Sequence, residues 1–131
     1  MSYPLDQSAN GSGFKTQGVG GENVPSHRLV YLADNGTWYQ ADASTDSTMP
    51  ASAITCGGLL RNQQGELLLF GLISLNEWRW ASRKLLYASK TPGFLTQTRP
   101  DVIGDQVQVV GLALTETLIL FNPNYVIVEV Q

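Results

Sequence analysis

Short apolar runs separated by turn-forming residues dominate the chain from residue 28 onward. The run at 28–33 is followed by Asn35-Gly36 and then by a second run at 37–41, which predicts a β-hairpin because Asn and Gly accept the positive φ angles of tight turns. Two further apolar runs, at 54–60 and 66–75, are separated by a polar turn. No window of eleven or more residues keeps a helical period. The pattern therefore predicts an all-β protein.

The same order of features occurs a second time along the chain. A basic residue, two aliphatic residues and a tyrosine are followed in both copies by a glycine turn, a polar loop with a proline, and two apolar runs. The offset between the copies drifts between 51 and 57 residues. The matched segments are 28–31 with 84–87, 58–60 with 111–114, and 67–70 with 118–121. We therefore predict one β domain at 27–131, a small β-barrel or sandwich built from two tandem hairpin-plus-strands units at about 28–75 and 84–131.

Residues 1–26 have a different composition, with many glycines and few large apolar side chains. Such a segment buries too little surface on its own to offset the entropy of ordering it. We therefore interpret it as a flexible or extended N-terminal arm that orders when it docks on a neighbour. The apolar residues expected to dock are Phe14, Val19 and Val24.

Charged residues make up only 15% of the chain, which is low for a soluble domain and suggests that part of the surface faces another chain. The net charge of −3 argues against nucleic acid and anionic membranes as partners, because both need a basic surface. The N-terminal residues do not have the pattern of a signal peptide, and no apolar run is long enough to predict a membrane helix.

Candidate catalytic or metal-binding residues are few. The chain has one histidine, His27, and one cysteine, Cys56, and no serine lies in a nucleophile-elbow pattern. We therefore expect no enzyme activity, no metal site and no cofactor, with Cys56 as a small buried residue and His27 solvated or capping at an edge. A small hydrolase that uses loop aspartates stays open, although aspartates in such loops usually form turns. These aspartates are Asp42, Asp46, Asp101 and Asp105.

The tryptophans have two interpretations. Trp78 and Trp80 lie two residues apart in the segment 77–87, which we predict to be another strand, so both side chains would point to one face. Tryptophan is enriched in cores and subunit interfaces, which favours that role for the pair. The alternative is an exposed platform for stacking glycans, formed by Trp78 and Trp80 together with Trp38 and Tyr39.

The C-terminal half resembles a known group of proteins. The segment from Lys84 to Pro100, with Thr91-Pro92-Gly93, is followed by Gly104-Asp-Gln-Val-Gln-Val-Val-Gly-Leu-Ala-Leu114 and by Phe121-Asn-Pro-Asn124. This sequence is similar to a segment common in virion structural proteins of tailed bacteriophages, namely capsid decoration (cement) proteins and head- or tail-fibre proteins. The similarity covers about residues 84–131, with a weaker echo at 28–75.

The resemblance implies a β-barrel-like body that assembles on the capsid surface, often as a homotrimer, with the major capsid protein as partner and no catalytic residues. The protein would be made in the host cytoplasm and function in the virion. Because the chain is short and has no fibre shaft, we expect a decoration protein that stabilises the assembled head shell. The alternative is a glycan- or host-binding module of a head or tail fibre.

Overall fold

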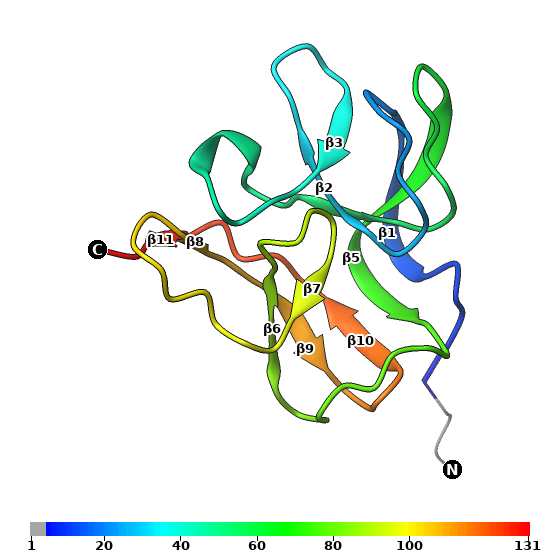
Figure 1. The fold of residues 1–131 in the computed structure, drawn as a ribbon. Coiled ribbons are helices and arrows are strands. Elements are labelled where there is room, and N and C mark those ends of the chain that lie inside the picture. Colours follow the sequence, from blue (N-terminus) through cyan, green and yellow to red (C-terminus); the bar gives the residue numbers. More distant parts are fainter. Residues whose placement is uncertain (1–4) are drawn as a thin grey trace.

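The computed structural model describes residues 5–131, and these form eleven β-strands and one short 3-10 helix (Figure 1). The predicted all-β class is therefore confirmed. The elements are β1 (Ser12–Val19), β2 (Leu29–Leu32), β3 (Trp38–Gln40), the 3-10 helix (Asp46–Thr48), β4 (Ala53–Thr55), β5 (Gln64–Ser74), β6 (Leu85–Ala88), β7 (Leu95–Thr96), β8 (Gln106–Val107), β9 (Val109–Ala113), β10 (Leu118–Phe121) and β11 (Val128–Glu129).

Nine strands form one curled antiparallel sheet, and β8 and β11 form a small second sheet. The strand order of the large sheet is β3-β2-β4-β5-β10-β9-β6-β7, with β1 paired to β5 outside this path. The long strand β5 joins the two parts of the sheet, because Leu67 and Leu68 pair with β4 whereas residues 71–74 pair with β10 (Figure 1). The architecture is thus a half-barrel, in agreement with the predicted barrel or sandwich.

The two parts of the sheet have the same pairing order, since β3-β2-β4-β5 corresponds strand by strand to β7-β6-β9-β10. The residue register suggested by the sequence match does not hold, however. Leu29 is fully buried, whereas Leu85, its partner in that match, is 46% exposed. The structure instead aligns Leu29 with Leu86, because both lie in the main core, whereas Val30, the sequence partner of Leu86, is buried in a different cluster on the opposite side of the sheet. That the halves arose by duplication stays a prediction.

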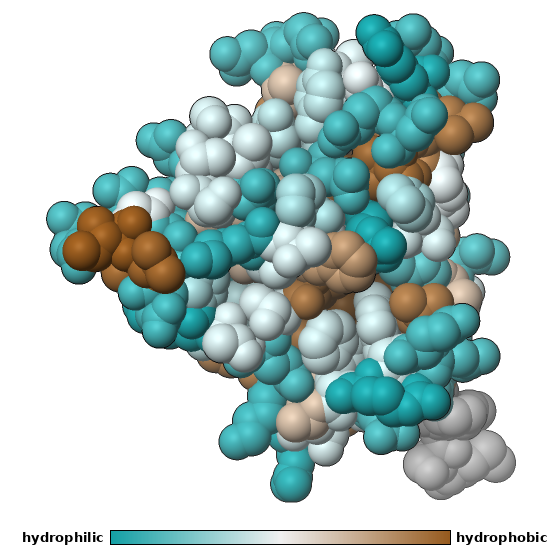
Figure 2. Space-filling model, in the orientation of Figure 1, coloured by the Kyte–Doolittle hydropathy of each residue, from teal (hydrophilic) through white to brown (hydrophobic). Residues whose placement is uncertain are grey.

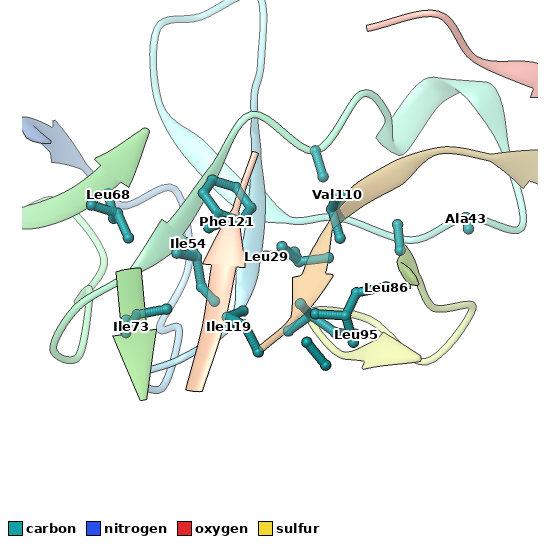
Figure 3. Close-up of a cluster of buried hydrophobic side chains, with 14 of the residues drawn as sticks. Leu29, Ala43, Ile54, Leu68, Ile73, Leu86, Leu95, Val110, Ile119 and Phe121 are labelled. Carbon is teal, nitrogen blue, oxygen red and sulfur yellow. The ribbon is translucent and has the colours of Figure 1, made fainter. Parts of the chain in front are cut away.

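The main core fills the concave side of the curled sheet (Figure 3). Leu29, Ile54 and Leu68 contribute from the first half, and Leu86, Ile119 and Phe121 from the second. Buried apolar side chains of this kind provide most of the driving force for folding. The core therefore holds both halves together as one unit.

The N-terminal segment is part of the folded body, which corrects the prediction of an arm at 1–26; residues 1–4 lie outside the described residues. Residues 12–19 form β1, which pairs with β5 over its whole length. Gly13 and Gly71 face each other with φ angles of +144° and +148°, and a Cβ on either would lie about 2 Å from a backbone oxygen of the other strand. Two glycines thus allow a close approach that attaches this segment to the sheet.

A second, smaller core lies on the opposite side of the first half of the sheet. Val24 is 2% exposed and packs there with Trp38, Leu59 and Leu67. Val24 and Leu59 also exchange two backbone hydrogen bonds of 2.7 and 2.8 Å. Residues 20–25 therefore cover the outer side of the first half.

Candidate docking face

Four leucines form a continuous row across the outer side of the second half of the sheet. Leu72 pairs directly with Leu120, Leu120 with Leu112, and Leu112 with Leu85. Directly paired residues of antiparallel strands point to the same side of a sheet, so the row runs across β5, β10, β9 and β6. We call these four residues, together with Phe70, the leucine face.

The leucine face is open to solvent. Leu85 is 46% and Phe70 41% exposed, and the other three leucines are half-buried. A shallow groove of about 220 Å³ runs over it, lined by Leu85, Leu112 and Leu120 and bounded by Val109 and Asn122. Its contiguous exposed apolar surface makes the leucine face the candidate docking site.

The contrast between the two halves shows why this face is open. In the two halves, β10 corresponds to β5 and β9 to β4, so the pair Leu120–Leu112 corresponds to the pair Leu67–Thr55. Leu120 therefore occupies the position of Leu67. Leu67 is fully buried under the second core, whereas Leu120 keeps part of its side chain exposed. The chain segment that covers the first half has no counterpart over the second half among residues 5–131.

A further apolar patch lies at the end of the molecule formed by β8 and β11. Ile103 is 79% exposed and Val102 54%, and the loop that carries them is bonded to the C-terminal strand through Gly104 and Val130. Val128 in β11 is 51% exposed. Figure 2 shows a strongly hydrophobic patch at the left edge, where β8 and β11 lie in Figure 1. We call Val102, Ile103 and Val128 the apolar tip.

Trp78 and Trp80 do not lie on a strand, which corrects the prediction for 77–87. Only residues 85–88 of this region form a strand, and the loop before it is held by hydrogen bonds from the Trp80 backbone N–H to Glu116 and from the Trp78 N–H to Leu75. The two rings lie 5.8 Å apart and pack against the main core, half-buried. The rings thus pack on the chain's own core, and a role for the pair in a subunit interface stays a prediction.

The other aromatic candidates are separated from that pair. Trp38 is 8% exposed and belongs to the second core, so its ring face is not available as a platform. Tyr39 is half-buried and stacks on Tyr31 on another surface. The four residues predicted to form one glycan platform are therefore not brought together.

The three predicted docking residues of the N-terminal segment also have different environments. Phe14 is 71% exposed and lies against Phe70 with ring centroids 6.2 Å apart, at the margin of the leucine face. Val19 is half-buried at the end of β1. Val24 is buried in the chain's own second core and cannot contact a partner in this conformation. Of the three, Phe14 has the exposure that docking requires.

His27 is buried, which corrects the expectation of a solvated edge residue. Its Nε2 lies 3.0 Å from the carbonyl oxygen of Ser74, so this nitrogen carries the proton and donates, while Nδ1 has no hydrogen-bond partner among the described residues. The ring meets Trp78 edge-on at 5.6 Å. This packing makes His27 a part of the core next to the tryptophan loop.

Two of the four loop aspartates, Asp42 and Asp105, act as turn formers. Asp42 Oδ1 accepts hydrogen bonds from the backbone N–H and the hydroxyl of Ser44, and Asp105 Oδ2 accepts from the Val102 N–H. Asp105 also pairs with Lys90 at 3.1 Å. Within residues 5–131, no three His, Cys, Asp or Glu side chains are grouped so that they could hold a metal ion.

Cys56 is expected to resist thiol reagents in the folded protein. Its side chain is buried, and burial together with the charge of Glu66 raises the pKa of the thiol to about 11. The thiolate is the reactive form, so little of it exists at pH 8. We expect negligible reaction with Ellman's reagent at pH 8 in native buffer and one reacting thiol per chain in 6 M guanidinium. Rapid labelling of the native protein would contradict the burial of this side chain.

The sequence matches no protein-family model and no curated protein sequence. Within the described part of the chain, no helix has the length and apolar character needed to cross a membrane.

Proposed function

We propose that this protein is a decoration (cement) protein that binds the outer surface of an assembled bacteriophage head and stabilises the shell. The leucine face is the observation that carries the proposal, because it is a continuous apolar sheet surface with no covering segment among residues 5–131. The major capsid protein is the proposed partner, in line with the resemblance of residues 84–131 to virion structural proteins.

A protein that binds only the assembled shell stabilises that shell by mass action. The leucine face supplies apolar area for such binding, and Phe14 extends it along β1. The paired strands β5, β10, β9 and β6 hold the leucines in place before binding. A preorganised surface loses little conformational entropy on association, so most of the gain from burying it contributes to affinity.

We further propose that the protein acts as a homotrimer, with the apolar tip in the contacts between subunits. Val102, Ile103 and Val128 have the exposure expected of interface residues before assembly. The native mass tests this step separately, because a single chain has a mass of 14.3 kDa. If the native mass at micromolar concentration were that of a monomer, the trimer proposal would be rejected, and the proposal of shell binding would be unaffected.

The proposed binding is tested by co-sedimentation with head shells that lack this protein, prepared from the virus that encodes it. We expect saturable binding and an increase in the melting temperature of the shell. A small β protein of similar charge serves as the control for non-specific pelleting. Recovery of the chain in the supernatant at all shell concentrations would reject the decoration role and favour the fibre-module alternative.

A further inference from the structure

A second surface, which we call the tyrosine groove, lies beside the β2–β3 hairpin. Its volume is about 380 Å³, and its walls include Glu22, Tyr31, Tyr39, Gln40 and Asp42. None of these residues belongs to the leucine face or to the apolar tip. The groove is therefore a separate feature, and its properties do not depend on the decoration role.

The two tyrosine rings are held in place on both sides. Tyr31 and Tyr39 are directly paired between β2 and β3, with centroids 5.9 Å apart and planes inclined by 27°. Tyr31 also packs against the main core, and Tyr39 lies so close to Gly21 that a Cβ there would fall 2.2 Å from the ring. The groove thus has a preorganised aromatic wall.

The carboxylates beside this wall are only partly satisfied. Glu22 Oε2 accepts a hydrogen bond of 2.8 Å from the Gln40 N–H, and Asp42 Oδ1 accepts from Ser44. These bonds fix both side chains. Glu22 Oε1 and Asp42 Oδ2 have no donor among the described residues, so each carboxylate keeps an oxygen for a ligand.

The groove is negatively charged. No lysine, arginine or histidine lines it. Burial raises the pKa of Tyr31, and the charge of Glu22 raises it further. Hydrogen bonds with Thr37 and Asn35 lower the pKa of Tyr39, and Arg61, an exposed residue outside the groove, lowers it further, whereas burial and the charge of Glu22 oppose this change. The charge of Glu22 thus acts on both tyrosines of the groove.

We infer that the tyrosine groove binds an organic cation, a guanidinium or alkylammonium group, between its carboxylates and its tyrosine rings. A cation compensates the two carboxylates and is attracted to the faces of aromatic rings. A neutral sugar would donate hydroxyl hydrogen bonds to the carboxylates but leave both of their charges uncompensated. The charge of the groove thus favours a cation over the glycan that an aromatic wall alone would suggest.

The groove can receive such a cation from two sources, an arginine side chain of a partner protein or a small quaternary ammonium compound. The test is an NMR titration of the full chain, with the Tyr31 and Tyr39 ring signals as the readout. The probes are N-acetylarginine amide, its neutral analogue N-acetylcitrulline amide, choline and N-acetylglucosamine. We expect the arginine probe to bind with a Kd on the order of 1 mM and the citrulline probe at least roughly tenfold more weakly. Tighter binding of choline than of the arginine probe would assign the quaternary ammonium source.

Two variants locate the site. Glu22→Gln and Asp42→Asn each remove one charge, and each is expected to weaken binding of the tighter cation roughly fivefold or more. Glu116→Gln, which removes an exposed charge between β9 and β10, is the matched control and should bind unchanged. Three results would overturn the inference. The first is equal binding of the arginine and citrulline probes without tighter choline binding, and the second is tighter binding of the sugar. The third is no change of either tyrosine signal at the highest concentrations of arginine probe and choline. None of these outcomes bears on shell binding.

Discussion

Replacing Gln108 by leucine is expected to lower the free energy of unfolding by about 2–4 kcal/mol, a large part of the roughly 5–15 kcal/mol typical of a domain. Gln108 is fully buried and forms two hydrogen bonds of 2.9 Å with one residue, donating from Nε2 to the Ala51 carbonyl and accepting at Oε1 from the Ala51 N–H. The side chain thus replaces a backbone partner for Ala51. Leucine would fill a similar volume but leave both backbone groups buried and unpaired.

Urea unfolding monitored by tryptophan fluorescence measures this effect. Gln63→Leu is the matched control, because Gln63 is exposed in the turn before β5 and should change stability by less than about 0.5 kcal/mol. If Gln108→Leu unfolded at the same urea concentration as the control, the bridge between Gln108 and Ala51 would not contribute as the structure indicates.

The double variant Leu112→Thr, Leu120→Thr is expected to weaken shell binding roughly 1,000-fold, since buried anchors at the centre of an interface contribute about 2 kcal/mol or more each. Both side chains lie in the middle of the leucine face and are half-buried. Threonine is β-branched and favours strands, so the fold should be retained. Binding is measured by co-sedimentation, and circular dichroism checks the fold.

A second double variant, Leu32→Thr, Leu60→Thr, is the matched control. These leucines are 52% and 49% exposed and lie outside the leucine face. We expect this variant to bind like the wild type. Equal loss in both double variants would show that general surface hydrophobicity, and not the leucine face, drives binding.

The sequence pattern predicts the all-β class and several of the strands well, because turn residues and apolar runs act locally. The alternating and continuous apolar runs locate β2, β5, β9 and β10 within a few residues. Register is harder to predict, because a shift of one residue exchanges the buried and exposed sides of a strand. The burial of Leu29 and the exposure of Leu85 are an example, since both follow a basic residue in similar tetrads.

The N-terminal segment and the tryptophan loop were predicted wrongly for a different reason. The attachment of β1 to β5 depends on Gly13 meeting Gly71, a contact between residues far apart in the sequence. Composition alone describes Gly13 as part of a flexible stretch. Likewise, Trp78 packs against the core and against His27, and no local sequence pattern indicates these contacts.

The leucine face had a partial signal in the sequence. Leu118-Ile-Leu-Phe121 is apolar at every position, which is typical of a strand covered on both sides. The structure buries Leu118, Ile119 and Phe121 and leaves only Leu120 partly exposed, so one apolar position of the run lacks a covering partner among residues 5–131. The tyrosine groove had no such signal, because Glu22 and Asp42 approach the hairpin from two separate segments.

A cryo-electron microscopy map of head shells incubated with the protein tests the central claim most directly. We predict density for the half-barrel on the outer surface of the shell, oriented so that β9 and β10 face the capsid protein and Leu112 and Leu120 are buried at the contact. Density that contacts the shell through another surface would contradict the role of the leucine face, and the absence of added density at saturating concentration would contradict the decoration role itself.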